Sequence, residues 1–292
     1  MAGRVITLPG VSFVASDAPL LVTTDPIESA GSLYLVDCTH PAGAWPSGVP
    51  ASGDTVPNLF GSTLSGLSSG AVDPTIVIGG TIDDAIIGSI ERTGKGGLHV
   101  IVSQAHALSL GDGVKITMPS ALEAYLASHT SHHYYLSVWD RLTRAQGANA
   151  DACWTVSTTN TSTNSGIAVG YVVAFGTPVG VNRLNQDILD NVLGPRFGNV
   201  ATDACAGSVT NNKTAGPIWG APIDGVGSTA LSNRNGKWPS AAFYRCYIED
   251  LTVSGRTYAE VHAIDTTLFA DLVLTPGGRY YGDTWTSPSE IP

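Results

Sequence analysis

The stretch that decides the fold is Ala241 to Asp265, AAFYRCYIEDLTVSGRTYAEVHAID. Its first half alternates with the period of a β-strand, in which successive side chains point to opposite faces. Tyr244, Cys246 and Ile248 share one face, which is apolar enough for a core. The opposite face carries charge and aromatic bulk and therefore suits a groove or an interface. Its members are Phe243, Arg245, Tyr247 and Glu249.

A turn and a short helix follow this strand. Gly255 takes a positive φ at little steric cost, which predicts a turn at Ser254–Arg256. Thr257 and Glu260 have the spacing of a capping box, in which the hydroxyl accepts from the third helical N–H and the carboxylate reaches back. The sequence predicts a single helical turn that ends at about His262.

A strand that ends in Glu-Asp-Leu-x-Val, followed by a glycine turn and a short capped helix, resembles the closing segment of laminin-G-like and concanavalin-like β-sandwich domains. The resemblance covers the 25 residues from Ala241 to Asp265. It implies a concanavalin-like (jelly-roll) antiparallel β-sandwich. In overall texture the wider chain resembles the virion structural proteins of tailed bacteriophages that carry such sandwiches.

The composition also favours β structure. Only 13% of the 292 residues are charged, roughly half the usual share. Gly, Ser, Thr, Asn and Pro take their place, which is typical of many short strands joined by turns. With 43% apolar residues the chain can bury a core. We therefore expect a mainly β fold with short helices.

Charge and hydropathy restrict the partners. The net charge is −10, and no window of five residues holds more than two Lys or Arg, so nucleic acid is not an expected partner. Pro9, Gly10 and Asp17 interrupt the first apolar residues, which argues against a signal peptide. No apolar segment approaches the ~20 residues that span a bilayer, so no membrane partner is expected. Both absences agree with a virion protein made in the host cytoplasm.

We expect one domain with two arms. Residues 1–60 hold seven prolines and one strand, Ser32–Asp37, and form the proline-rich N-terminal arm. Residues 61–265 form the sandwich, and residues 266–292 form an extended aromatic C-terminal arm. Such arms drape over the domain itself or over a neighbouring subunit. The aromatic residues expected at an interface are Trp45, Tyr280, Tyr281 and Trp285.

Other elements are predicted from local patterns. Ser120 and Glu123 predict a second capping box, and a helix that ends at about Ser128. Residues 176–240 look irregular, with a short helix near Asn185–Leu193. The remaining strands are predicted at Thr75–Ile78, Leu98–Ser103, Val114–Met118, Tyr134–Asp140, Cys153–Ser157 and Gly166–Phe175.

No motif predicts catalysis or a cofactor. Thr93–Gly97 lacks the order of a phosphate loop and is better explained as a hairpin turn. Ser103 lies near His106, but no G-x-S-x-G pentapeptide surrounds it. The carboxylates that could serve a glycosidase by type alone are Asp83, Asp84, Glu91, Glu249 and Asp250. We therefore expect no catalytic residues and no enzyme.

Three histidines, His129, His132 and His133, suggest a metal site, but the adjacent pair points to opposite faces if extended, and no acidic or Cys ligand has the usual spacing. A histidine-lined loop or subunit contact explains them better. The four cysteines, Cys38, Cys153, Cys205 and Cys246, are far apart in sequence. Buried free thiols and disulfide pairing both remain open, and Cys246 should be reduced.

These observations favour a non-enzymatic structural component of a phage particle, in the capsid decoration, the neck or collar, or the tail. It would assemble with copies of itself and other virion proteins through its arms and sandwich faces. The resemblance also implies an alternative, a carbohydrate-binding adhesin for a host surface glycan. Its sugar site would use Trp154, Trp219, Trp238, Asp224, Asn233 and Asn235, with no calcium signature visible. Burial in the core or between subunits explains the same Trp residues equally well.

Overall fold

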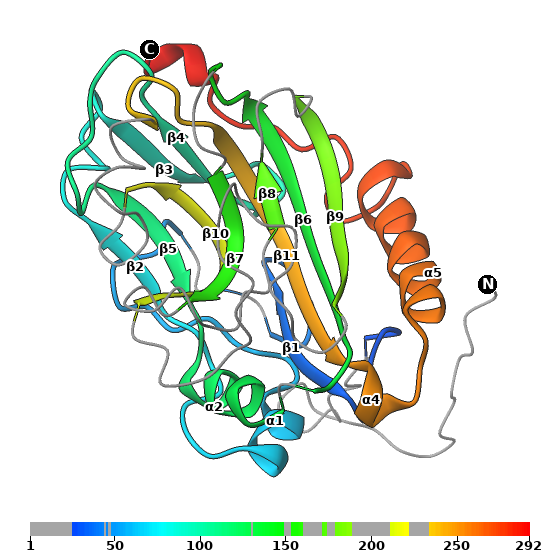
Figure 1. Ribbon diagram of the computed structural model, residues 1–292. Coiled ribbons are helices and arrows are strands. Elements are labelled where there is room, and N and C mark those ends of the chain that lie inside the picture. The colour runs from blue at the N-terminus through cyan, green and yellow to red at the C-terminus, as the bar shows by residue number, and fades with distance from the viewer. Residues whose placement is uncertain are drawn as a thin grey trace, which may run out of the picture.

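The fold is a sandwich of two antiparallel β-sheets, as predicted (Figure 1). The computed structural model describes residues 25–43, 45, 48–129, 131–148, 153–159, 171–173, 179–188, 211–221 and 234–292. Of these, residues 153–159, 171–173, 182, 184–188 and 211–213 are described by their backbone alone. All strand pairs are antiparallel. The mainly β fold class is therefore confirmed.

The six-stranded sheet is built around β11 (Ser240–Asp250). β6 pairs with β11 along its whole length on one side. On the other side, β4 pairs with its first half and β1 with its second half. The sheet order is β3-β4-β11-β6-β9, with β1 also paired to β11. The bounds are β1 Ser32–Asp37, β3 Gly88–Arg92, β4 Leu98–Val102, β6 Tyr134–Arg144 and β9 Gly180–Ile188.

The second sheet has five strands in the order β2-β5-β10-β7-β8. Buried side chains of the two sheets belong to one large core cluster, to which Cys246 and Ile248 of β11 contribute. Burial of this apolar surface is the main stabilising term of the fold. The bounds are β2 Ile76–Gly79, β5 Gly113–Thr117, β7 Cys153–Thr159, β8 Tyr171–Val173 and β10 Asn211–Gly220.

The predicted open face of β11 is covered. Every residue from Ser240 to Asp250 is buried, so the face with Arg245 is no exposed groove or interface. A register shift between Phe243 and Arg245 also breaks the strict alternation that the sequence suggests. As a result Phe243 contacts Trp45, and the Tyr244 hydroxyl donates to Asp283 of the C-terminal segment.

The C-terminal segment supplies this cover. α4 (Leu251–Ser254) ends at Gly255, whose φ of 70° confirms the predicted turn. α5 (Tyr258–Phe269) begins with the predicted Thr257–Glu260 capping box and continues past His262 into a π-helix, Ala270–Leu274. The helix is longer than predicted because Val261, Asp265 and Leu268 pack onto the sheet. Residues 266–274 are therefore helical, and not part of an extended arm.

Several local predictions need correction. α2 (Ser120–Ser128) is confirmed as a helix, but its capping box is not, because the Ser120 hydroxyl accepts from Ala71 N at 2.9 Å. α1 (Gly61–Leu67) was not predicted, since a run of Gly, Ser and Thr has low helix propensity. The short helix predicted near Asn185–Leu193 is wrong over its first four residues, which belong to β9. β10 likewise occupies a part of the region predicted to be irregular.

The described part of the N-terminal arm lies on its own domain. β1 has the predicted bounds. Asn58 fixes the segment behind it, because its side-chain amide donates to Leu33 O at 3.1 Å and its Oδ1 accepts from Leu35 N at 2.9 Å. Val56 and Phe60 are buried beside it. In the described part of the chain, none of the helices has the length and apolarity to cross a bilayer.

The capping box gives a stability prediction. Thr257→Ala removes the hydroxyl that accepts from Glu260 N at 3.3 Å, and should lower the free energy of unfolding by about 1 kcal/mol in urea titrations. Thr266→Ala, in the exposed last turn of the same helix, is the matched control and should change it by less than about 0.5 kcal/mol. Equal effects of the two changes would contradict a capping role.

Candidate functional site

The candidate functional site is an open groove of about 430 Å³ between β2 and β3, the edge strands of the two sheets. Its apolar lining comes from Val49, Pro50, Ala51, Ile78 and Ile90, and its polar lining from Ser52, Asp83 and Ser89, beside Gly80. Val49 is 55% exposed. An open groove with an apolar lining of which one side chain is largely exposed indicates a contact surface for another chain.

The end of the groove depends on a glycine. Gly80 has a φ of 63°, and a Cβ added there would lie 2.0 Å from Asp112 Oδ1. That oxygen accepts from Thr81 N at 2.7 Å and from the Thr81 hydroxyl at 3.1 Å. The glycine thus lets the chain leave β2 and cross to the other sheet over the groove floor.

The aromatic residues predicted at an interface lie mostly on their own domain. Trp45 is 5% exposed, in the core cluster beside Phe243, with the Arg92 guanidinium 5.2 Å from its ring centroid. Tyr280 is buried, and its hydroxyl donates to Asp37 Oδ1 at 2.7 Å. These two side chains therefore anchor the segments that carry them to the sandwich.

The other two aromatic residues are more accessible. Trp285 is half-buried, with the Arg141 guanidinium 4.5 Å from its ring centroid and the His99 ring at 6.3 Å. Tyr281 is 42% exposed. Only Tyr281 of the four thus keeps a largely open surface for a partner.

The predicted sugar-binding residues do not form one described cluster. Trp219 and Trp238 belong to the buried core, where they donate to Ala241 O at 3.0 Å and to Asn235 Oδ1 at 3.3 Å. Asn235 Oδ1 also accepts from Leu108 N at 3.0 Å, so this amide fixes a loop. The Trp154 side chain, Asp224 and Asn233 lie outside the described residues.

The histidines are linked to a buried carboxylate. His132 Nδ1 lies 2.5 Å from Asp250 Oδ2, which also accepts from the Tyr125 hydroxyl at 2.8 Å. The His129 ring stacks on Tyr125, with ring centroids 4.1 Å apart. Asp250 Oδ1 caps α4 through Val253 N. Among the residues that the structure describes, no group of three or more His, Cys, Asp or Glu side chains could hold a metal ion.

A fully buried arginine holds the face of the six-stranded sheet that α5 covers. Arg245 pairs with Asp25 at 2.7 Å and with Asp37 at 3.3 Å, and its guanidinium lies 4.8 Å from the Trp139 ring centroid. Burial raises the pKa of Asp25, but the hydrogen bond of His40 and the charge and hydrogen bond of Arg245 outweigh it and lower that pKa well below its usual range. The pair stays ionised although it is buried.

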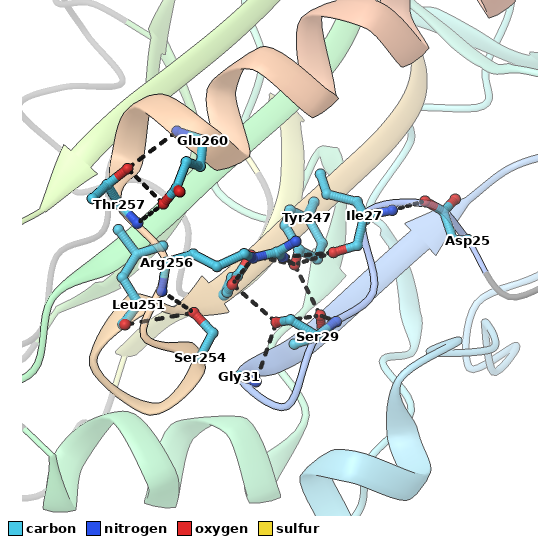
Figure 2. Close-up of polar contacts among 12 residues, drawn as sticks. Asp25, Ile27, Ser29, Gly31, Tyr247, Leu251, Ser254, Arg256, Thr257 and Glu260 are labelled. Carbon is cyan, nitrogen blue, oxygen red and sulfur yellow. Dashed lines mark hydrogen bonds and ion pairs between the residues drawn. The ribbon is translucent and has the colours of Figure 1, made fainter.

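The end of β11 is joined to the N-terminal segment by a second ion pair, between Arg256 and Glu249. Figure 2 shows Arg256 of this pair beside Tyr247 and Ile27. Arg256 Nε donates to Glu249 Oε1 at 2.8 Å, and its Nη2 donates to Ile27 O at 2.7 Å. The Ser29 hydroxyl donates to Glu249 Oε1 at 2.9 Å. The Tyr247 hydroxyl also contacts Glu249, and burial followed by the Glu249 charge raises the pKa of Tyr247. Glu249 is therefore fully engaged in holding the chain together.

The remaining candidates for chemistry also make structural contacts. Glu91 lies 2.6 Å from the buried His99 and accepts from Thr286 N at 2.7 Å, so it fixes the C-terminal segment. Ser103 is buried, accepts from His106 N at 3.0 Å and donates to Pro292 O. Its distance to His106 Nδ1 is 3.4 Å. Asp83 is exposed and lines the groove, the exposed Asp84 follows it, and the other candidate carboxylates are not among the lining residues.

The two described thiols are buried and free. Cys38 donates to Phe243 O at 3.3 Å, and burial raises its pKa to about 12. Burial also raises the pKa of Cys246. The prediction that Cys246 is reduced is confirmed. The side chains of Cys153 and Cys205 lie outside the described residues.

The buried ion pair gives a pH prediction. Asp25→Asn leaves Arg245 short of a counter-charge and should lower the free energy of unfolding by about 3 kcal/mol near neutral pH. A carboxyl whose pKa is lowered in the fold stabilises it above its unfolded pKa, so the difference should shrink as the pH falls below about 4. Urea titrations of both proteins at several pH values measure it. Glu28→Gln, an exposed neighbour, is the control and should show no such trend.

The thiols give a labelling prediction. In a Cys153→Ser, Cys205→Ser variant, a thiol reagent at about pH 8 should not react with the folded chain, since a pKa of about 12 leaves roughly one Cys38 in ten thousand as thiolate. Both remaining thiols should react once urea unfolds the chain. Rapid labelling of the folded variant would show that they are accessible.

No protein-family model and no curated protein matches this chain. A solved structure of Trypanosoma rangeli sialidase is similar at 8% identity and a TM-score of 0.39, over 80% of this chain and 32% of that one. The same enzyme in complex with 2,3-difluorosialic acid, as a covalent intermediate, gives 7%, 0.34, 80% and 33%.

The binding domain of botulinum neurotoxin DC, in complex with rat synaptotagmin II, is similar at 9% identity and a TM-score of 0.28, over 83% of this chain and 53% of that one. This chain thus spans about a third of the sialidase and about half of the toxin domain. With TM-scores this low, these likenesses carry no conclusion about function. The sandwich itself rests on the two sheets of this chain.

Proposed function

We propose that this chain is a non-enzymatic structural component of a larger assembly, and that the assembly is a phage particle. The observation that carries the assembly role is the open groove between the edge strands, whose apolar lining includes the exposed Val49. Apolar side chains that line an open groove, unlike single ones scattered over a surface, favour contact with another protein surface. The assignment to a phage particle rests on the overall resemblance of the sequence to phage virion proteins.

The absence of catalysis is proposed from the positions of the ionisable groups. Glu249 is neutralised by Arg256, Asp250 caps α4 and binds His132, and Glu91 binds His99. Each has a structural partner, and a glycosidase needs two carboxylates that flank one cleft. A glycan-binding role stays a prediction that depends on Trp154, Asp224 and Asn233.

An association measurement tests the proposal. Light scattering over a concentration series should show reversible self-association of the full chain. Val49→Asp should weaken it by about tenfold, because a charge then enters the apolar lining of the groove. Leu274→Asp, at an equally exposed position on the other side of the molecule, is the matched control and should leave it unchanged.

The particle assignment has its own test. Purified particles of a phage that encodes this sequence should contain the chain. Mass spectrometry should find it in a fixed ratio to the other particle proteins. Turnover of a polysaccharide by the purified, folded chain would overturn the non-enzymatic role.

A further inference from the structure

β3 is an outermost strand of its sheet and has one open backbone edge beside the groove (Figure 1). Ser103 N donates to Ile87 O at 2.8 Å, and Thr93 N donates to Gly97 O at 2.9 Å, so odd-numbered residues of β3 exchange hydrogen bonds with β4. In an antiparallel pair the intervening residues direct their N–H and C=O groups away from the partner. The backbone groups of Ile90 therefore point away from β4, which is the only strand paired with β3 in the described chain.

The facing edge of β2 is already occupied. The Ser52 hydroxyl accepts from Ile78 N at 3.0 Å, Gly53 N donates to Ile76 O at 2.7 Å, and Ile76 N donates to Asp54 O at 2.9 Å. The unpaired wall of the groove is thus the edge of β3. Such an edge is a template on which another strand can pair.

The two ends of β3 carry opposite charges. Asp83 and Asp84 precede the strand, and both are exposed. At the other end, Arg92 is the last residue of the strand and the exposed Lys95 follows it. None of these four side chains has an ion-pair partner among the residues that the structure describes. An antiparallel pair of two β3 strands would place the acidic end of each beside the basic end of the other, whereas a parallel pair would join like charges.

We propose that two copies of this chain pair antiparallel through β3 about a twofold axis, so that their six-stranded sheets join into one. This inference rests on the proposed assembly role. The axis passes beside Ile90, whose N–H and C=O bond to the same residue of the second copy, and Arg92 lies opposite Gly88. This register places Ser89 opposite Glu91. A shift by two residues would place the two Glu91 carboxylates opposite each other, which is unfavourable.

The pairing also covers the groove. Ile90 belongs both to β3 and to the apolar lining, and Val49 and Pro50 lie in the same lining. The twofold axis brings the grooves of the two copies together, so each lining is shielded by the other, and burial of apolar surface stabilises the pair. A strand cannot pair with itself within one chain, so the contact requires a second copy. Because both copies use the same surface, the assembly closes at two.

Charge reversal at the two ends of β3 tests the arrangement. Sedimentation equilibrium of the full chain at low ionic strength should give a dimer, at twice the 30.1 kDa of one chain. Asp83→Lys and Lys95→Glu, each alone, should weaken the dimer by about tenfold, because like charges then meet at both ends. An equimolar mixture of the two variants should regain it, since opposite charges meet again in the mixed pair. Asp271→Lys, at an exposed position outside the contact, is the matched control and should dimerise normally.

Ile90→Pro tests the backbone pairing. Proline removes the N–H that points away from β4, a position where an edge strand tolerates it, and should leave a folded monomer. Ile90→Val keeps that N–H and is the control, which should dimerise.

Three results would overturn this inference and leave the assembly role intact. They are a folded Ile90→Pro chain that dimerises normally, charge-reversed chains whose mixture does not regain the dimer, and a mass above that of two copies. The charge-reversed mixture decides if Ile90→Pro does not fold. An unchanged chain that stays monomeric at every concentration would overturn the assembly role as well.

Discussion

The fold depends on one strand that is buried on both faces. β11 carries the apolar core on one side, and on the other it places the guanidinium of Arg245 where solvent does not reach. A buried charge is tolerated only when it is paired, so Asp25 and Asp37 must lie beside it. This single requirement ties the N-terminal segment, β1 and β11 together. It also explains why Arg279 and Tyr280 converge on Asp37 from the C-terminal segment.

The buried polar side chains between the six-stranded sheet and the segments that cover it explain the course of both ends of the described chain. Asp265 of α5 accepts from Tyr135, Trp139 and Arg183, which lie on β6 and β9. The helix therefore bonds across two strands while its apolar residues cover the same sheet. The N- and C-terminal segments, which the sequence predicts to be arms, make their contacts with the rest of the chain on this face. The groove lies at the opposite edge, between β2 and β3.

The strands with strong local patterns were predictable from the sequence. Ser32–Asp37 follows from its unbroken run of apolar residues, and the hairpin turn at Thr93–Gly97 follows from its glycines. β9 and β10 were not, because Asn, Gly and Lys interrupt their alternation and pairing with β6 and β5 decides their structure instead. The full length of α5 depends on tertiary packing of Val261 and Asp265. The groove was not predictable, since it depends on where the sheets end.

The late position of β11 in the chain has a consequence for biosynthesis. β1, β4 and β6 leave the ribosome long before Ser240, and they have no common neighbour until β11 arrives. β4 can pair with β3 and β6 with β9, but the other edge of each, and the edge of β1, stay unpaired until β11 is made. Such edges are the parts of a nascent chain that aggregate. Folding of the first sheet is therefore completed after synthesis, by contacts that are distant in sequence and slow to form. A chaperone that shields strand edges during this interval would raise the yield of folded protein.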